Sequence, residues 1–368
     1  MGGADHRDTI LTIDLDGVAA NYRKLAGKIG RAQLAAVVKA DAYGLGVEPV
    51  SQTLAQAGCK DFFVATLGEA IQLRQILPGA GVHVLNGLPA GSAPEMTRHG
   101  LVPVLNSLGE VEEWSAHCAA QDYAGTADLH IDSGLTRLGL DGQEVERLAT
   151  GAGPDFQLDC LLSHLACADE LGNPMNGRQL EKFKALLSRL PRARAGIAAS
   201  SGIFLGPGYH LDMVRAGAAI FGINPTLGRP NPMAQVIRLQ AKILQTRIVD
   251  SPQTVGYGAT HRVSQPTRIA TVAAGYADGY MRALGNEGTA YIEDWKVSVL
   301  GRISMDLTGL DVTHVPQNLA RPGNYVDLIG AFNPIDQLAG EARTIAYEIL
   351  TGLRGRARRR YLKGGKVQ

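Results

Sequence analysis

A lysine at the end of a short apolar run is the residue with the clearest chemical potential. Residues 34–38 form the apolar run, Lys39 follows it, and Tyr43 comes four residues later in a turn with two glycines. Such a run predicts a buried strand. Because desolvation disfavours a charged ammonium, an amine in this position can act as a nucleophile that forms a Schiff base with a carbonyl. An ordinary strand-end lysine that reaches solvent is the alternative.

Other polar residues follow later apolar runs in the same way. They are His130, Asp132, Arg137, His164, Ser200, Ser201 and Arg215. In a parallel barrel the carboxyl ends of the strands meet on one rim, where the chemistry takes place. Each residue alone could be structural, such as a core histidine or a helix cap. Their shared place on one rim with Lys39 favours an active site.

Two short segments near the end of this series predict a phosphate pocket. Ser200-Ser201-Gly202 offers hydroxyl groups, and the segment Arg215-Ala216-Gly217-Ala218 offers bare backbone N–H groups. Barrels often bind phosphate in the loops after strands seven and eight, at a helix N-terminus. A phosphate pocket and an imine-forming lysine on the same rim indicate pyridoxal 5′-phosphate as the cofactor.

The elements that must position these residues alternate between strands and helices. Strand-like runs occupy residues 34–38, 62–65, 82–85, 101–105, 127–131, 158–163, 196–199 and 213–216. Helical patterns occupy residues 17–29, 50–57, 68–77, 108–121, 143–150 and 177–190. This alternation predicts an α/β protein with an N-terminal (β/α)8 barrel. A doubly wound sheet is the alternative, but the nucleotide-binding loops GxGxxG and GxxxxGK[ST] that would favour it do not occur.

The pattern changes near Asn231. Short β-type runs separated by Gly, Pro and Asp then predict a mostly β C-terminal domain. We therefore expect the barrel over residues 10–230 and the β domain over residues 231–368. A run at residues 9–13 is too short to assign. The tail, residues 354–366, has seven Lys and Arg residues and no acid; a solvated face or charge pairing between subunits is favoured over a nucleic-acid patch.

Length and composition limit the class of protein. The 368 residues exceed one ordinary domain, and the net charge of +1 gives no general attraction to nucleic acids or anionic membranes. No apolar run approaches membrane-spanning length, and the polar N-terminus, Met1–Asp8, has no apolar export segment. We expect a cytoplasmic protein with no nucleic-acid or membrane partner. The four cysteines have no zinc spacing, and no metal site is expected.

The motifs together resemble the alanine racemase family over nearly the whole chain. In the barrel, the family's lysine, arginine, histidine and strand-eight arginine motifs resemble residues 37–44, 132–139, 163–169 and 213–217. In the β domain, residues 255–260 resemble the segment with the catalytic tyrosine, and residues 275–280 and 301–306 complete the set. The resemblance implies a pyridoxal phosphate-dependent racemase that interconverts L-alanine and D-alanine.

The resemblance also implies a role for each matched residue. Lys39 would hold the cofactor and act as a base on one face of the substrate Cα, and Tyr257 from a second subunit would act on the other face. The implied cofactor-binding residues are Tyr43, His164, Ser200, Arg215, Gly217 and Ala218, and the implied substrate-binding residues are Arg137, Met305 and Tyr276. The implied assembly is a head-to-tail homodimer with shared active sites.

Arg215 would face the pyridine nitrogen of the cofactor, supported by His164. A guanidinium cannot accept a proton, so it should keep that nitrogen unprotonated and limit transamination. Tyr43, Ser200 and the backbone of Gly217 and Ala218 would bind the phosphate.

Two positions depart from the family pattern. His130 stands where some members carry a carbamylated lysine, and an imidazole cannot copy an anionic carbamate, so Arg137 must be positioned otherwise. Gly355 stands near the place of a phosphate-binding tyrosine in some members, so no phosphate contact is expected there.

Three other readings of the motifs stay open. A racemase with broader or serine specificity is the main alternative. Arg215 argues against a decarboxylase of basic amino acids, which has an acid opposite the pyridine nitrogen. The β domain argues against a non-catalytic pyridoxal phosphate carrier, which resembles the barrel alone. The motifs do not distinguish a role in cell-wall synthesis from one in alanine catabolism.

Overall fold

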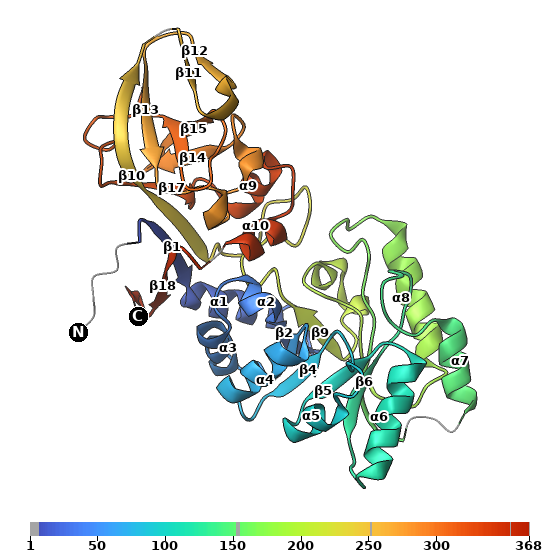
Figure 1. Ribbon diagram of the computed structural model, residues 1–368. Helices are drawn as coiled ribbons and strands as arrows, with labels where there is room; N and C mark the ends of the chain where they lie inside the picture. The colour runs from blue at the N-terminus through green and yellow to red at the C-terminus, as the bar shows by residue number, and fades with distance from the viewer. Residues whose placement is uncertain (1–6, 152–154, 251, 354, 368) are drawn as a thin grey trace, which may run out of the picture.

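The computed structural model describes residues 7–151, 155–250, 252–353 and 355–367 (Figure 1). Most of the polar N-terminal segment and Arg354, the first residue of the basic tail, lie outside the described residues. The chain forms a barrel and a second, mostly β part. Their buried apolar side chains belong to one contiguous core. Within the described residues, no helix combines the length and the apolar character that a membrane span requires.

Eight parallel strands form the barrel, in the order β8-β7-β6-β5-β4-β3-β2-β9. A backbone hydrogen bond of 3.0 Å from Arg215 N to Ala198 O and a bridge between Ala199 and Arg215 connect the two ends of this sheet. Each predicted strand is confirmed to within a few residues, and so is the barrel. The strands are β2 (Gln33–Val37), β3 (Asp61–Val64), β4 (Gly81–Val84), β5 (Val102–Leu105), β6 (Thr126–His130), β7 (Gln157–Leu162), β8 (Arg194–Gly196) and β9 (Met213–Ala216).

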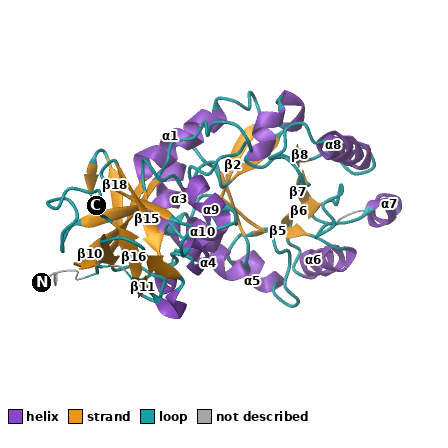
Figure 2. Ribbon diagram, turned by 90° about the horizontal axis from the view of Figure 1, so that it is seen from above, coloured by secondary structure: helices purple, strands orange, loops and turns teal. Residues whose placement is uncertain are grey.

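Helices surround the barrel, as the view along its axis shows (Figure 2). The six predicted helices are confirmed: α1 (Leu15–Ala26), α3 (Val47–Gln56), α4 (Leu67–Ile76), α6 (Leu108–Ala120), α7 (Gly142–Thr150) and α8 (Pro174–Leu187). Two short helices were not predicted, α2 (Lys39–Tyr43) and α5 (Ala93–Arg98). Both are too short to show a helical period in the sequence. Short 3-10 turns, η1 (Ser201–Leu205) and η2 (Pro207–Tyr209), follow β8.

The second part is built on a sheet in the order β13-β16-β15-β14-β17-β10-β1-β18-β19. Because β13 also pairs with β10, the strands from β13 to β10 close into a ring without free edges. The mostly β domain is thus confirmed. Its strands are β10 (Ile237–Val249), β13 (Thr267–Val272), β14 (Thr289–Ile292), β15 (Trp295–Leu300), β16 (Thr308–Asp311), β17 (Tyr325–Ile329), β18 (Arg358–Lys363) and β19 (Lys366–Val367), with a separate hairpin of β11 (Gln253–Val255) and β12 (His261–Val263).

The first strand of the chain belongs to this second sheet. β1 (Thr9–Asp14) runs antiparallel to β10 and parallel to β18, so strands from the beginning and the end of the chain lie side by side in the second part (Figure 1). We expected the barrel to begin at residue 10, but the hydrogen bonds of β1 connect it to the second sheet. The run is too short for periodicity to reveal its partner, which lies more than two hundred residues later. The domain ranges as such stay a prediction.

Two helices of the second part were also not predicted, α9 (Ile335–Glu341) and α10 (Ala346–Gly352). Helix α10 packs against the segment after Lys39. Gly44 has a φ of +83°, and a Cβ there would lie 2.9 Å from the carbonyl oxygen of Leu350. The rings of Tyr347 and Tyr43 lie 6.2 Å apart between centroids. The second part therefore supports the rim of the barrel that carries the predicted site.

Candidate active site

The predicted rim residues of the barrel act on one another electrostatically. Burial and the neighbouring Arg137 charge lower the pKa of Lys39, and Glu69 opposes them. Burial, Arg215, Arg137, His130 and Lys39 together lower the pKa of His164 to about 3. These effects require the groups to lie close together. The structure thus brings Lys39, Arg137, His164 and Arg215 into one site.

The backbone after Lys39 adopts a conformation that the sequence did not predict. Ala40, Asp41, Ala42 and Tyr43 all have φ between +53° and +58°. For a residue with a side chain, this left-handed region costs roughly 1–2 kcal/mol. Such a segment persists only where its surroundings hold it.

Glu69 is a residue of this site that the sequence reasoning missed. Its Oε1 accepts a 2.8 Å hydrogen bond from Ala40 N, and its Oε2 accepts one of the same length from Ala65 N. Glu69 also forms a capping box with Thr66 at the start of α4. The pattern Thr-x-x-Glu after an apolar run is a readable signal for that role. Its additional contact with the Lys39 turn has no sequence signal.

Hydroxyl and backbone N–H groups converge after β8 and β9. Ser200 Oγ lies 3.1 Å from the backbone N atoms of both Gly217 and Ala219, and Ser200 and Ala218 are buried. A Cβ on Gly217 would lie 2.4 Å from the Tyr43 hydroxyl, so only glycine permits this approach. Burial raises the pKa of Tyr43, which therefore stays a hydrogen-bond donor. Such donors suit a phosphate group, so this pocket fits pyridoxal 5′-phosphate.

Arg215 is fixed by backbone carbonyl groups. Its Nη1 donates to Gly196 O at 3.0 Å, and its Nη2 donates to Ser163 O. Burial lowers its pKa to about 10, so the guanidinium stays charged near neutral pH. The Phe63 ring lies 5.9 Å below it. The positive charge of Arg215 acts on His164, and the two carbonyl groups, which the sequence did not indicate, hold the guanidinium in place.

His130 is a neutral group with a defined tautomer. Asn106 Nδ2 donates to Val104 O at 2.8 Å, which leaves Asn106 Oδ1 to accept the 2.8 Å hydrogen bond from His130 Nδ1. Burial, Arg215 and Arg137 lower the pKa of His130 to about 4. His130 is therefore uncharged near neutral pH, and it cannot supply the negative charge that a carbamylated lysine would place beside Arg137. Arg137 itself is exposed on the loop after β6.

The remaining predicted residues lie in the second part and are exposed. Tyr257 is 73% exposed, Met305 54% and Tyr276 42%. Tyr257 begins the turn η3 (Tyr257–Ala259) between β11 and β12, a hairpin of the second part (Figure 1). The groups that shift the pKa of Lys39 do not include it.

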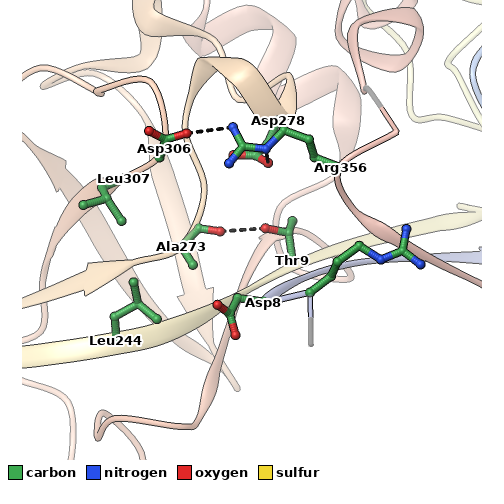
Figure 3. A pocket seen from close by; sticks show the side chains of 9 residues that line it. Asp8, Thr9, Leu244, Ala273, Asp278, Asp306, Leu307 and Arg356 are labelled. Carbon is green, nitrogen blue, oxygen red and sulfur yellow. Dashed lines mark hydrogen bonds and ion pairs between the residues drawn. The ribbon is translucent and has the colours of Figure 1, made fainter. Parts of the chain in front are cut away.

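The loops that carry Tyr276 and Met305 are joined by backbone hydrogen bonds, and Figure 3 shows Arg356 between Asp278 and Asp306 of the same loops. Tyr276 N donates to Ser304 O at 3.1 Å, and Ala277 N donates to Met305 O at 3.0 Å. Arg356 bridges both loops, because its Nη1 lies 2.7 Å from Asp306 and its Nε lies 3.4 Å from Asp278.

The same loops border an open cavity of about 490 Å³, which is also lined by Thr9 and Leu244 (Figure 3). The lining of this cavity contains none of the predicted site residues. Arg356 and Arg359 of the basic tail make ion pairs with acids of their own chain. These two arginines thus have partners in their own chain, and Arg356 stays about half exposed at 51%, so pairing of the tail between subunits stays a prediction.

A buried polar cluster lies elsewhere in the barrel. The ligand atoms of His83, Asp128 and Asp159 lie within 4.8 Å of one another. However, His83 pairs with Asp128 at 2.7 Å, and Asp159 pairs with Arg194 at 2.5 Å. Burial would lower the pKa of His83, but Asp128 and Asp61 raise it to about 9. These ion pairs account for the cluster without a metal ion.

Comparisons with known proteins cover both parts of the chain. The family described as alanine racemase, N-terminal domain, matches residues 13–225, and the family described as alanine racemase, C-terminal domain, matches residues 236–361. An alanine racemase of Rhodospirillum rubrum is 46% identical over 98% of each chain. A catabolic alanine racemase of Mesorhizobium japonicum is 44% identical over 96% of this chain and 93% of its own.

Solved structures are similar in the same way. Alanine racemase from Bartonella henselae with covalently bound pyridoxal phosphate has a TM-score of 0.94 and 37% identity, and the match covers 96% of this chain and 99% of that one. The biosynthetic alanine racemase of Pseudomonas aeruginosa has a TM-score of 0.91 and 32% identity, with coverage of 97% and 100%.

Proposed function

Because the chain belongs to the alanine racemase family and interconverts L-alanine and D-alanine with pyridoxal 5′-phosphate as its cofactor, we propose that Lys39 and Tyr257 move the substrate proton. The observation that carries this proposal is the lowered pKa of Lys39 among the rim residues of the barrel. A lysine with a lowered pKa has more of its unprotonated amine near neutral pH, as a base requires.

The barrel residues would hold the cofactor between them. Lys39 would bind it through its amine. Tyr43, Ser200 and the backbone N–H of Ala218 would donate hydrogen bonds to its phosphate, and so would Gly217 N–H, which in this structure donates to Ser200 Oγ. When bound, pyridoxal 5′-phosphate withdraws electrons from the substrate and so makes the proton at Cα acidic.

Racemisation needs one group on each face of the substrate Cα. Lys39 would remove or return a proton on one face, and the Tyr257 hydroxyl would do so on the other. A single base on one face would return the proton to the side from which it came. Two groups on opposite faces invert the configuration in both directions.

Arg215 would control the protonation of the cofactor nitrogen. Its guanidinium is held by two carbonyl groups and cannot accept a proton. It would therefore keep a positive charge beside that nitrogen and disfavour its protonation. Neutral His164 adds no competing charge.

Substrate binding would use groups from both parts of the fold. Arg137 would bind the alanine carboxylate, and the backbone N–H of Met305 would donate to the same carboxylate. Tyr276 would narrow the entrance and so favour a small side chain. The bonds between the Tyr276 and Met305 loops support this joint role, because they fix the two residues relative to each other.

We propose that two chains assemble head to tail and share their active sites. Tyr257 and Met305 are exposed, and Tyr257 is not among the groups that shift the pKa of Lys39 in its own chain, so a second chain would supply the second base of each barrel site. Exposed apolar side chains of the same part, Leu244, Ile248 and Leu307, suit burial against a partner. The domain of residues 231–368 would then complete the site of the other subunit.

Chiral analysis of L-alanine incubated with the protein and cofactor tests the activity. We expect D-alanine to form until both enantiomers are equal, and turnover of serine, arginine and lysine to be much slower. Negligible turnover of alanine, with rapid turnover of serine, would favour the alternative of broader or serine specificity.

Two variants test the residue roles. Lys39→Ala should lose the visible absorbance of bound cofactor together with the activity. Tyr257→Phe should keep that absorbance and lose racemisation, while exchange of the Cα proton with solvent persists from one enantiomer only. Equal exchange from both enantiomers in Tyr257→Phe would refute the assignment of two bases.

A further inference from the structure

The C-terminal strand β18 contacts the turn that carries Lys39. Arg359 Nη1 donates to Asp41 Oδ2 at 3.0 Å, and Arg359 Nη2 donates to Gly44 O at 2.8 Å. Tyr361, two residues later, donates from its hydroxyl to Leu45 O at 3.0 Å. In a strand, residues two apart point to the same side. One side of β18 therefore rests on the turn.

The contacted turn has an unfavourable backbone conformation. Ala40 to Tyr43 all lie in the left-handed region. Such a conformation persists only where surrounding groups determine it. Within the barrel, Glu69 binds Ala40 N and the side chain of Asp41 accepts from Val47 N at 2.7 Å. Arg359 binds Asp41 within the left-handed segment and Gly44 directly after it, so one side chain connects the two.

The geometry of both tail residues suits a rigid support. The planar guanidinium of Arg359 binds a carboxylate and a carbonyl with two of its nitrogens, which a lysine could not do in the same way. The Tyr361 hydroxyl lies so near the backbone that a Cβ on Gly46 would come within 2.2 Å of it. Gly46 has a φ of +96°, which also favours glycine.

We propose that Arg359 and Tyr361 are positioning residues for the cofactor site. They hold residues 39–46 so that the Lys39 amine and the Tyr43 hydroxyl keep their places in that site. The proposal rests on the proposed function, because it takes Lys39 and Tyr43 as cofactor-binding residues. Strand β18 pairs with β1, so the end of the chain is tied into the fold and can carry this support.

The test compares four variants of the full-length protein loaded with cofactor. Arg359→Met removes both hydrogen bonds and keeps an apolar stem, Arg359→Lys keeps the charge, and Tyr361→Phe removes the hydroxyl. Arg360→Met is the matched control, because it removes the same charge from the other face of β18. The dissociation constant of pyridoxal 5′-phosphate is measured from its visible absorbance. Amide hydrogen exchange is measured at Gly44, Gly46 and Val47, with and without cofactor.

Arg359→Met should weaken cofactor binding about tenfold and speed exchange at these amides. Arg359→Lys and Tyr361→Phe should shift both quantities in the same direction by less. Arg360→Met should stay within about twofold of the unmodified protein, since the charge alone is not the cause. Should Arg359→Met fail to fold, Arg359→Lys and Tyr361→Phe decide the question by the same criteria.

Unchanged cofactor affinity in the Arg359 and Tyr361 variants would overturn the proposal, even if exchange became faster. An equal loss of affinity in Arg360→Met would also overturn it, because the effect would then belong to the charge or the strand. Failure of the proposed function is seen separately. If Lys39→Ala still showed the visible absorbance of bound cofactor, the proposed role of Lys39 would be wrong. Amide exchange in the cofactor-free protein does not depend on that role, so it still reports whether Arg359 and Tyr361 support the turn.

Discussion

At the scale of single residues, the site combines fixed positive charges with neutral imidazoles. Arg215 and Arg137 lie near His130 and His164, and burial together with these charges keeps both histidines unprotonated. A neutral histidine can accept a hydrogen bond without adding charge beside the cofactor. The motifs indicated which residues meet here. The pKa values depend on burial and on neighbours from other strands, and no local sequence pattern carries that information.

The two histidines should make stability depend on pH. Below the unfolded pKa of about 6.5, the unfolded chain binds protons at His130 and His164 that the folded chain does not take up until about pH 4 and 3. Stability should therefore rise with pH across this window. Each histidine should contribute a slope of about 1.4 kcal/mol per pH unit.

Urea unfolding of the cofactor-free chain between about pH 4.5 and pH 6, where the unfolded histidines are largely protonated, measures this slope. His164→Gln should remove one histidine's share. A slope that His164→Gln does not alter would contradict the assignment of a neutral, buried His164.

The close approach of Tyr43 to Gly217 gives a second prediction at this scale. In Gly217→Ala, the new methyl would lie 2.4 Å from the Tyr43 hydroxyl, so the tyrosine must move. We expect cofactor affinity to fall by about tenfold or more and the unfolding free energy to fall by about 1–3 kcal/mol. Gly340→Ala is the control, since a Cβ there has nothing within 4 Å.

Adding Tyr43→Phe to Gly217→Ala separates packing from phosphate binding. Phenylalanine lacks the hydroxyl that meets the new methyl, so the double variant should regain stability. It should not regain cofactor affinity, because the hydroxyl donor is also lost. Thermal unfolding and cofactor titration report the two effects, and additive losses of stability in the double variant would exclude the clash.

At the scale of elements, the sequence predicted the strands and helices that have a hydrophobic pattern of their own. Each barrel strand is a short apolar run, and α1 or α6 is long enough to show a helical face. The left-handed segment after Lys39 was read only as a turn, because alanine, aspartate and tyrosine rarely adopt positive φ. Contacts with Glu69, Arg359 and α10 impose it, and those groups are distant in sequence.

The loops joined by Arg356 provide a prediction at this scale. Arg356→Met removes the bridge between Asp278 and Asp306 and should loosen the loops that carry Tyr276 and Met305. We expect kcat/KM for alanine to fall about tenfold, with no change in the visible absorbance of the cofactor. Steady-state kinetics of Arg356→Met and of the control Arg343→Met, at an 84% exposed side chain, measure the effect. Identical kcat/KM values in both variants would exclude a role for the bridge.

At the scale of the whole molecule, the chain begins and ends in the second sheet. Strand β1 leads from that sheet into the barrel, and β18 returns beside it. The two parts share one core, and α10 and β18 both support the turn of Lys39. The sequence pattern indicated two domains. It did not indicate that β1 pairs with β10 and β18, because these strands lie more than two hundred residues later in the chain. The proposed site shared between two chains likewise rests on the family motifs and not on any pattern of charge or apolar residues.

A mixed dimer of Lys39→Ala and Tyr257→Phe chains tests the central claim, that each site takes one base from each chain. The two chains are produced together with different affinity tags, and the mixed dimer is isolated. One of its sites lacks both bases, and the other has Lys39 from one chain and Tyr257 from the other. We predict about half the activity of the unmodified dimer, while each parent dimer is inactive. An inactive mixed dimer would contradict the account, because sites built within single chains would each still lack one base.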